Sequence, residues 1–526
     1  MKYDKALIIS RYHDDFSNPI YNAYVRGIQS QCSIIHFIDY FDQIGALGKQ
    51  GFEEQIENLL VKEEINLIFF IFVSGDPILD PLFIQKVAAK RFIAMVFWDS
   101  EQFFEQIDRY YAQLADLVIL PANYEYFYKL KGLGINAICS FSLFDKDKYK
   151  SLNNPSMKID VSFVGEVTKG KRKEYISYLE ENGINIEAYG NGTKNGKVSF
   201  ERVVEIFNTS KINLSFTGTY ANSVYSFCSN INDRILQNKG KPIEIAMCGG
   251  FVLTEYVPGI EKVFPQKDID TFQTKEELLE KIRFYLSHES LRSKMAASAH
   301  LYASHHYDSI EAFGEIFKQI SCITPKENKN LILDPIFLKV HNTFHFYYFI
   351  TFLFQERFAL ALEEMRYIIK NRYLILKDAK RFLFWEMPKI VQKIKLKRYC
   401  NALFNSIGKE DVVIYGAGIH TLTLMEAVST TKNLNLKAIA DKDPTKWGKK
   451  MFRVPVVSPD KITTHAKCVI ISSFAFEKEI KKELLQMYAD DITIYTLYDN
   501  FNVSFTSAHY QRTDPYQKFR NLLVYR

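Results

Sequence analysis

The sequence lacks the features that mark secreted, membrane-spanning and zinc-stapled proteins. Its seven cysteines are scattered over 526 residues without a Cys-x-x-Cys pair, which argues against a structural zinc site and indicates a reducing compartment. The longest apolar run, Phe344–Phe354, is too short to span a bilayer. No charged-then-apolar leader precedes the strand-like start at Met1. We therefore expect a cytoplasmic protein, and the length predicts about three or four domains.

Positive charge is concentrated in one segment. The formal net charge is +6, and residues 331–400 alone carry 13 Lys+Arg against 6 Asp+Glu, a net +7. The rest of the chain is therefore close to neutral, and we expect no nucleic-acid partner. The same segment has 15 aromatic residues. A basic aromatic helical face can lie on an anionic membrane, although such aromatics also pack between domains, and both interpretations stay open.

Short apolar runs alternate with helix-like stretches through most of the chain. A first series comprises Ala6–Ser10, Ser33–Tyr40, Asn66–Val73, Ile93–Trp98 and Leu117–Pro121, and a second comprises Val161–Gly165, Ile184–Tyr189, Ile212–Phe216 and Phe251–Leu253. Such alternation is typical of parallel α/β sheets covered on both faces. The sequence therefore predicts two Rossmann-like lobes with a cleft between them.

A helical segment and a third α/β unit follow. Residues 325–408 lack strand alternation, and a further series comprises Asp411–Gly418, Leu436–Asp441, Lys467–Ser473 and Ile492–Leu497. The predicted domains are 1–150, 151–325, a helical basic and aromatic region at 326–408, an accessory Rossmann-like domain at 409–500 and a tail at 501–526. The expected fold class is α/β throughout the sheet-forming domains.

The most informative stretch is Lys239–Glu255. It places Lys241 and Glu244 on a predicted helix, breaks at Gly249 and Gly250, and enters a short strand. Glycines at a helix end let a ligand approach the backbone closely. A carboxylate can accept hydrogen bonds from a sugar diol, and lysines can neutralise phosphates. This combination indicates a sugar-nucleotide site.

The loop after the strand Val161–Val164 has a similar character. Gly165–Arg172 places a glycine, a hydroxyl and cations that include Lys169 and Arg172 at a strand end and a helix start. Ligands of open α/β lobes sit at the carboxyl ends of strands, and helix N-termini favour anions. A solvated polar loop is the alternative. Together with Lys241 and Glu244, the loop favours a diphosphate site.

These motifs resemble those of group-1-type glycosyltransferases with two Rossmann lobes, the GT-B architecture. The resemblance rests on Lys239–Phe264, continues through Thr274–Leu278 and Tyr285–Arg292, and takes in Asp160–Gly165 and Ser210–Ser215. It is most similar to the spore-maturation-protein-type branch and covers most of residues 160–320. A weaker resemblance in the first lobe rests on Val96–Asp99.

The resemblance implies roles for individual residues. Glu244 would hold the ribose hydroxyls of a UDP-, GDP- or dTDP-sugar donor, and Gly249 and Gly250 would lie close to that donor. The branch usually has arginine where Lys241 stands, and lysine keeps the charge but loses the bidentate fork. Related families carry an earlier glutamate at the position of Leu236, so the two-glutamate arrangement is not reproduced. Enzymes of this kind stabilise the leaving diphosphate without an obligatory metal, and we expect no required cofactor and no metal site.

The acceptor should meet the amino-terminal lobe. His13 and Asp15 follow the first predicted strand, and Asp99 follows Trp98 at another strand end. Any of them could supply a general base if the reaction inverts the anomeric centre, and no base is required if it retains. An ordinary loop histidine and a helix cap are the alternatives. The sequence does not choose between inversion and retention.

The third unit opens with Gly416 and Gly418, and Asp441 ends its next strand at the spacing of a ribose contact. A full dinucleotide fingerprint wants a third glycine where Thr421 stands, so the signal is weak. The unit is similar to the Rossmann-like domain preceding many sugar-nucleotide acyltransferases, which can bind sugar nucleotides. A nonbinding docking domain is the alternative. Asp441-Lys-Asp443 fits a D-x-D metal pattern but reads equally as an acidic turn.

The sequence therefore predicts a hexosyl- or related transferase (EC 2.4) acting on a glycan, lipid-linked or protein acceptor. A lipid-linked acceptor would favour peripheral contact of residues 331–400 with the inner face of the cell membrane. A noncatalytic sugar-nucleotide-binding or scaffold protein is the main alternative. An NAD-dependent enzyme that uses residues Gly416 to Asp441 is the weakest alternative.

Overall fold

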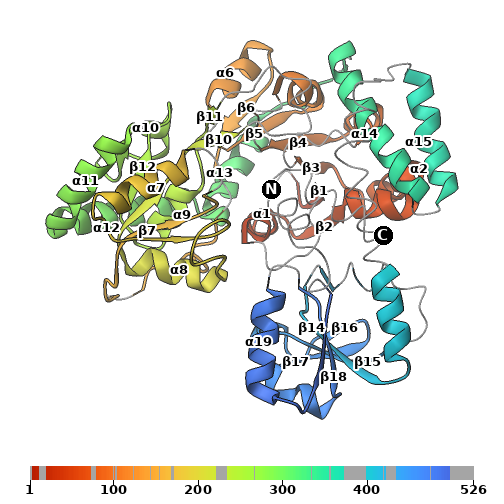
Figure 1. Ribbon diagram of the computed structural model, residues 1–526. Helices are drawn as coiled ribbons and strands as arrows, with labels where there is room; N and C mark the ends of the chain where they lie inside the picture. Colours follow the sequence, from red (N-terminus) through yellow and green to blue (C-terminus); the bar gives the residue numbers. More distant parts are fainter. Residues whose placement is uncertain are drawn as a thin grey trace. The chain divides into compact units, whose positions relative to one another are not determined.

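The computed structural model groups the chain into two compact units, residues 1–341 and 342–526. The residues that it describes are 3–10, 19–72, 79–98, 100, 104–121, 124–141, 144–152, 155–167, 171–220, 234–265, 267–327, 329–332, 334–354, 357–371, 398–418, 420–421, 424, 434–473 and 476–497. The first unit contains two parallel α/β lobes, and the second contains a helical region and a third sheet (Figure 1).

The first lobe is built on a six-stranded parallel sheet of order β2-β1-β3-β4-β5-β6. Its strands are β1 Lys5–Ser10, β2 Ile34–Asp39, β3 Leu67–Phe72, β4 Phe92–Phe97, β5 Leu117–Leu120 and β6 Ala137–Cys139. Every residue of β3 and β4 is buried, because helices cover both faces of a parallel sheet. This explains why these strands appear in the sequence as uninterrupted apolar runs.

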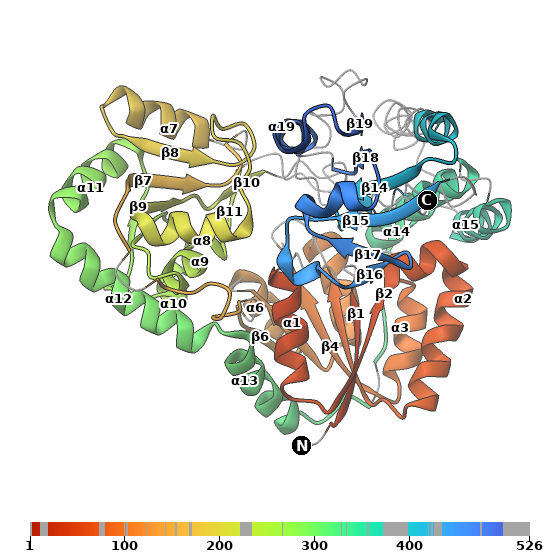
Figure 2. The ribbon, with the colours of Figure 1, turned by 90° about the horizontal axis from the view of Figure 1, so that it is seen from below.

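Helices lie on both faces of that sheet. They are α1 Pro19–Gln29, α2 Tyr40–Lys62, α3 Pro81–Ala88, α5 Arg109–Tyr111 and α6 Tyr124–Gly132. A short π-helix at Phe104–Asp108 and a 3₁₀ turn at Ala112–Leu114 flank α5. Figure 2 shows α1 on one face and α2 and α3 on the other. Helix α2 is interrupted at Gly48, whose φ of 75° lies in the left-handed region that glycine tolerates.

The second lobe has a five-stranded parallel sheet of order β13-β12-β9-β7-β8 and a separate antiparallel pair, β10-β11. Its strands are β7 Ile159–Val164, β8 Ile186–Tyr189, β9 Ser210–Ser215, β10 Gly218–Tyr220, β11 Arg234–Leu236, β12 Val252–Glu255 and β13 Asp270–Phe272. The strands predicted from the sequence are confirmed within one or two residues at most of their ends. The β10-β11 pair was not expected, because three-residue strands leave too little alternation to detect.

The helices of the second lobe are α7 Arg172–Glu181, α8 Phe200–Thr209, α9 Lys241–Met247, α10 Ile260–Val263, α11 Lys275–Ser287 and α12 Glu289–His306. Thr274 caps α11: its side chain accepts a hydrogen bond from the Glu277 amide at 3.2 Å, as the Thr-x-x-Glu spacing of a capping box predicts. Helix α13, Ser309–Cys322, then packs against α1 of the first lobe. A Cβ on Gly27 would lie 2.3 Å from the Phe313 ring, so glycine permits this close approach.

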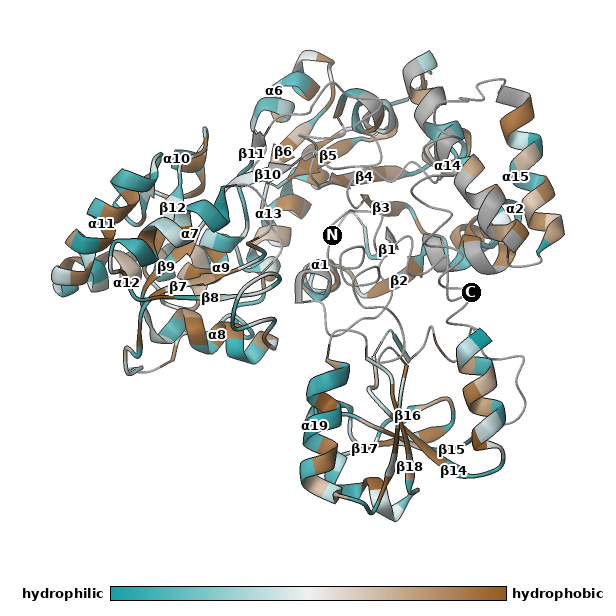
Figure 3. Cartoon of the chain, viewed as in Figure 1, coloured by the Kyte–Doolittle hydropathy of each residue, from teal (hydrophilic) through white to brown (hydrophobic). Residues whose placement is uncertain are grey.

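The second unit begins within α14, Pro335–Phe354, and continues with α15, Phe358–Asn371, and a helical stretch at 398–407. Its sheet has the order β16-β17-β15-β14-β18-β19. The remaining elements are β14 Asp411–Tyr415, β15 Asn435–Ala440, β16 Lys450–Met451, β17 Val454–Val457, β18 Cys468–Ile471, α19 Glu477–Tyr488 and β19 Thr493–Thr496, with 3₁₀ turns at Pro444–Lys446 and Pro459–Thr464. Figure 3 shows that the strands are mostly hydrophobic and that the helices carry hydrophilic residues. The predicted α/β fold class, with two Rossmann-like lobes and a further sheet domain, is confirmed.

Candidate functional site

The carboxyl edge of the second lobe gathers several of the expected residues. Helix α9 connects the chain after β9 to β12, which pairs parallel to β9. A crossover helix runs back against its strands, so the N-terminus of α9 lies at the carboxyl edge of the sheet. Lys241 and Glu244 are both in the first turn of α9. The structure therefore places the predicted ribose residue at the edge where α/β lobes bind ligands.

Lys241 and Glu244 form an ion pair. The Lys241 Nζ lies 2.6 Å from Glu244 Oε2, and the two side chains are 29% and 13% exposed. Lys241 also lies 5.4 Å from the centre of the Phe207 ring, within cation–π range. A lysine expected to neutralise a diphosphate is thus held beside the carboxylate expected to bind ribose. The lysine thus supplies a counter-charge to the largely buried carboxylate.

The surroundings of Glu244 are apolar and close-packed. Tyr149, which is 3% exposed, and Cys248, which is fully buried, lie near enough for the Glu244 charge to act on them. Burial, reinforced by that charge, raises the pKa of the Tyr149 hydroxyl and of the Cys248 thiol above their ordinary values. Both groups therefore stay neutral around Glu244. Tyr149 belongs to the segment that links the lobes, and its contribution was missed because an isolated tyrosine gives no motif.

Gly249 and Gly250 lie at the other end of α9. A Cβ on Gly250 would lie 2.7 Å from both the Phe207 carbonyl and the Asn213 side chain, and one on Gly249 would lie 2.6 Å from Ser151 Oγ. These neighbours belong to the end of α8, to β9 and to the interlobe segment. The glycine pair therefore lies where β12 begins, at the amino edge of the sheet. This placement does not bring the pair beside Glu244, and its glycines serve tight helix–strand packing.

Gly165 lies at the carboxyl end of β7, as expected. Its amide donates to the Tyr189 carbonyl at 2.8 Å. A Cβ on Gly190 would lie 2.2 Å from the Gly165 carbonyl oxygen, and Gly190 has a φ of 128°. The loops after β7 and β8 thus touch backbone to backbone, and only glycine at position 190 permits it. Lys169 falls outside the described residues.

Arg172 opens α7 and is committed to backbone carbonyls. Its Nη1 donates to Glu166 O at 2.9 Å, and its Nη2 donates to Gly218 O at 3.1 Å. The guanidinium lies 6.0 Å from the Phe163 ring centre. Arg172 is therefore at the predicted carboxyl edge, but it ties two loops together in this structure.

Glu255, at the end of β12, is a residue that the sequence reasoning missed. Its side chain is 5% exposed, and its Oε2 accepts hydrogen bonds from the Thr217 amide at 3.0 Å and the Gly218 amide at 3.1 Å. A carboxylate two residues after the apolar run Phe251–Leu253 was the available signal. Such a group must find donors when it is buried.

The candidate catalytic residues of the first lobe, His13, Asp15 and Asp99, lie outside the described residues. Their neighbours in sequence are described: Ser10 ends β1, and Trp98 follows β4. Because β1 and β4 are parallel members of one sheet, both positions flank its carboxyl edge. The three residues remain candidates on sequence alone.

In the third sheet, Asp441 is engaged by its own domain. Its Oδ2 accepts from the Ala417 amide at 2.6 Å, and its Oδ1 accepts from the Asp443 amide at 2.9 Å. Lys446 Nζ lies 3.3 Å from the same carboxylate. Gly416 has a φ of 116° and touches the Ser472 carbonyl, while Gly418 is exposed. The expected glycine loop and acid do come together, but the carboxylate caps that loop.

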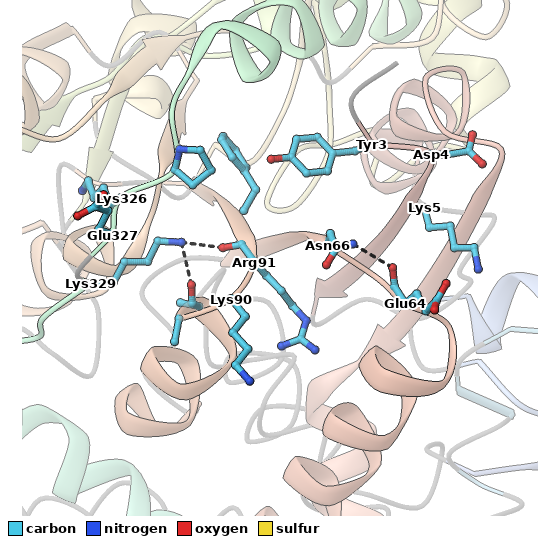
Figure 4. Close-up of a pocket in the computed structure, with 14 residues that line it drawn as sticks. Tyr3, Asp4, Lys5, Glu64, Asn66, Lys90, Arg91, Lys326, Glu327 and Lys329 are labelled. Atoms are coloured by element: carbon cyan, nitrogen blue, oxygen red, sulfur yellow. Dashed lines mark hydrogen bonds between the residues drawn. The ribbon is translucent and has the colours of Figure 1, made fainter.

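An open hollow of about 710 Å³ lies elsewhere, at the amino edge of the first sheet. Its cations include Lys5, Arg91 and Lys329, and each donates to backbone carbonyls at helix or strand ends. Figure 4 shows Lys329 reaching the backbone carbonyl of Arg91. Lys329 also pairs with buried Asp116 at 2.5 Å. These cations stabilise the negative ends of helix dipoles, so the hollow is explained by the fold.

Within the described ranges, no group of three or more His, Cys, Asp or Glu side chains is arranged to hold a metal ion. The Asp441-Lys-Asp443 pattern falls in those ranges and forms the capped turn described above. Among the same residues, no helix is both long enough and apolar enough to cross a membrane.

Comparison with known proteins adds two family matches. The glycosyl transferase-like family matches residues 171–312, and the family described as C2185-like, N-terminal, matches residues 408–495. The second match covers the third sheet and does not name the acyltransferase-type domain that the sequence resembles. A comparison with curated proteins gives no match.

Solved structures with similar folds are distant. The Anabaena protein Alr3699/HepE in complex with UDP-glucose has 12% identity and a TM-score of 0.43, covering 61% of this chain and all of that one. Sucrose-phosphate synthase (tll1590) from Thermosynechococcus elongatus has 11% identity and a TM-score of 0.40, over 60% of this chain and 99% of that one. Likenesses at this level add no functional argument. The family match carries the conclusion: residues 171–312, which hold Arg172, Lys241 and Glu244, are similar to a glycosyl transferase-like domain, within two α/β lobes of the GT-B kind.

Proposed function

We propose that this protein is a glycosyltransferase that moves a sugar from a nucleotide-sugar donor to a glycan, glycolipid or protein acceptor. The observation that carries the proposal is the Lys241–Glu244 pair in the first turn of α9, inside the segment that matches the glycosyl transferase-like family. A carboxylate at a ligand-binding edge suits a cis-diol such as that of ribose. The proposed reaction class is hexosyl or related transfer, EC 2.4.

The donor would sit against the carboxyl edge of the second sheet. Glu244 accepts hydrogen bonds from the two ribose hydroxyls, and Lys241 compensates its charge and lies within reach of the diphosphate. The ten-residue helix α7 directs its N-terminus to the same edge, which favours phosphate oxygens. Lys169 and Gly165 flank that end in sequence. The donor could be a UDP-, GDP- or dTDP-sugar.

Transfer breaks the bond between the anomeric carbon and the diphosphate oxygen, and the nucleoside diphosphate leaves with the bonding electrons. An acceptor oxygen forms the new bond and loses its proton. In an inverting reaction His13, Asp15 or Asp99 would accept that proton. Cations and helix N-terminal amides would stabilise the leaving diphosphate, so the proposed mechanism requires no metal.

Calorimetry of the full-length protein with UDP, GDP and dTDP tests the donor site. At least one should bind, and Glu244→Ala should abolish measurable binding of that nucleotide. Equal affinity in the wild type and Glu244→Ala would overturn the ribose assignment. If the wild-type protein binds none of the three nucleotides, the proposed donor class is overturned.

A noncatalytic sugar-nucleotide-binding or scaffold protein is the second candidate. It is favoured by Leu236, which is 41% exposed and stands where related families carry a glutamate. Slow donor hydrolysis separates the two candidates. Release of nucleoside diphosphate from a nucleotide sugar supports a transferase, and tight donor binding without any turnover supports the scaffold.

We also propose a family branch for the second lobe and a ligand class for the third sheet. The branch would be the spore-maturation-protein type. The third sheet would be a sugar-nucleotide-binding domain of the acyltransferase kind, with Gly416 and Gly418 near the ligand and Asp441 holding their loop in shape. Nicotinamide-cofactor binding to the third domain is the least favoured alternative. A thermal-shift comparison of UDP-sugars and NAD with the wild type and Asp441→Ala would separate these possibilities.

The helical region would make a peripheral contact with the inner face of the cell membrane. Phe358, Leu362 and Ile369 are 65%, 51% and 63% exposed, and their spacing places them on one face of α15. The surrounding segment has a net +7. The wild-type protein should sediment with anionic vesicles but not with zwitterionic ones. A Phe358→Ser/Ile369→Ser variant should lose this sedimentation. Equal sedimentation of the variant would overturn this contact.

A further inference from the structure

We infer that Glu255 and Arg172 are positioning residues of the donor site, which act by gripping the Thr217–Gly218 turn from opposite sides. The inference rests on the proposed donor site at the carboxyl edge. Arg172 would then act on the backbone and not through direct contact with the diphosphate. Glu255, which no sequence motif identified, would be a second residue that supports the site.

The carboxylate supplies one side of the grip. Glu255 Oε2 accepts from the Thr217 amide at 3.0 Å, from Thr217 Oγ1 at 3.2 Å and from the Gly218 amide at 3.1 Å. Glu255 is 5% exposed and Thr217 is fully buried. A buried carboxylate with several donors is held in one orientation, because losing any donor leaves charge uncompensated.

The guanidinium supplies the other side. Arg172 donates to the Gly218 carbonyl at 3.1 Å, so Gly218 has its amide held by Glu255 and its carbonyl held by Arg172. Arg172 also donates to Glu166 O at 2.9 Å. One arginine therefore joins the loop after β7 to the turn after β9. The planar fork of arginine suits two carbonyls at once, which a lysine ammonium does less well.

The gripped turn leads directly to α9. Gly218 begins β10 and pairs with Leu236 of β11, and the Gln237 amide donates to the Thr217 carbonyl at 3.1 Å. Three residues later, Gly240 caps α9. A Cβ added at Gly240 would lie 2.9 Å from the Phe144 ring. The segment between Gln237 and Lys241 is thus short and closely packed. A shift of the Thr217–Gly218 turn would move the start of the helix that carries Lys241 and Glu244.

Two substitutions test the grip. Glu255→Gln keeps the shape and one acceptor oxygen but removes the charge, and Arg172→Met removes both donors at a helix start. Matched controls in the same lobe also remove buried hydrogen bonds. Ser162→Ala removes the 2.8 Å bond that Ser162 Oγ donates to Asn213 Oδ1, and Arg292→Met removes the bond that the buried Arg292 donates to the Tyr285 carbonyl. Each full-length variant is measured by UDP calorimetry, donor-hydrolysis kinetics and thermal melting.

We expect Glu255→Gln and Arg172→Met each to weaken UDP binding on the order of tenfold, since small misplacements of a binding group are costly. The donor KM should rise more than kcat falls, and Arg172→Lys should recover part of the loss. The controls should lower the melting temperature by a similar amount while keeping wild-type affinity. If affinity follows melting temperature across all four variants, the role is structural only and the inference fails. If the wild type binds no nucleoside diphosphate, the proposed function fails instead, which is a distinct outcome.

Discussion

The second lobe and the third domain each place an acid at the carboxyl edge of a sheet, but the partners of the two acids differ. In the second lobe, Glu244 pairs with the side chain of Lys241 at 2.6 Å. In the third domain, Asp441 accepts from the Ala417 backbone amide at 2.6 Å. Both acids lie at the carboxyl edge of a parallel sheet. A side chain can swing away when a ligand arrives, whereas a backbone amide of a glycine loop moves only if the loop does.

Spacing alone therefore does not make an acid available to a ligand. Asp441 stands at the ribose position of a Rossmann-like unit, yet it caps the loop that a phosphate would need. Glu255 makes the same point within the second lobe, since its charge is consumed by the Thr217–Gly218 turn. Glu244 is the acid whose partner is exchangeable. We therefore expect nucleotide affinity to depend on Glu244 and domain stability to depend on Asp441.

The largest expected effect is the loss of nucleotide binding on replacing Glu244. Glu244→Ala should weaken nucleoside diphosphate binding by about 100-fold, because two hydrogen bonds to a charged group disappear. Calorimetry measures this change in affinity. The matched control is Glu205→Ala, which breaks the comparable Arg202–Glu205 pair on α8. A similar loss of nucleotide affinity in Glu205→Ala would show that breaking any ion pair of this lobe weakens binding.

Asp441→Ala should act on stability instead. Removing an acceptor for two amides should destabilise the third sheet by about 2 kcal/mol. Hydrogen exchange of the β14 and β15 amides measures this locally. Asp411→Ala, at the exposed start of β14, is the control. A fall in nucleotide affinity without faster exchange would contradict the comparison and make Asp441 a ligand contact.

Lys241 should have a smaller effect than Glu244. Lys241→Met removes the charge that compensates Glu244 and should weaken nucleotide binding by about tenfold. Lys241→Arg keeps the charge and should bind at least as well as the wild type. Calorimetry at two ionic strengths would show a weaker salt dependence for Lys241→Met. An unchanged affinity in Lys241→Met would remove this lysine from the site.

The last expected effect, which is absent at neutral pH, is a pH dependence of the third domain. His420 accepts or donates a 2.8 Å hydrogen bond with Ser472 Oγ, and burial lowers the pKa of its imidazole to about 4. The unfolded chain therefore binds a proton that the folded domain does not, between pH 6.5 and about 4. Stability should be full above pH 6.5 and fall as the pH drops toward 4.

Thermal melting of the wild type and His420→Asn across that range measures the effect. The variant should lose the steepest part of the pH dependence, and His465→Asn serves as a control within the same domain. If His420→Asn and the wild type lose stability in parallel, the dependence arises from other groups.

The elements were largely predictable from the sequence, because apolar runs such as Leu67–Phe72 and Val161–Val164 depend on local periodicity and burial. The Thr274 cap was predictable for the same reason, since it involves neighbouring residues. The site was predictable only in part. Glu244 and Gly165 lie at the expected edge, whereas Gly249 and Gly250 lie at the other end of α9. A seven-residue helix separates its ends by about 10 Å, and sequence proximity hides that distance.

The order of the α/β units and the chemical types available near Lys239–Glu255 follow from the sequence alone. The partner of each charged group depends on the tertiary packing. Lys241 faces Glu244, Arg172 and Glu255 hold one turn, and Asp441 caps its own loop. The physical reason is that periodicity fixes local conformation, whereas a buried charge takes whichever donor or acceptor the packing of distant segments brings within about 3 Å.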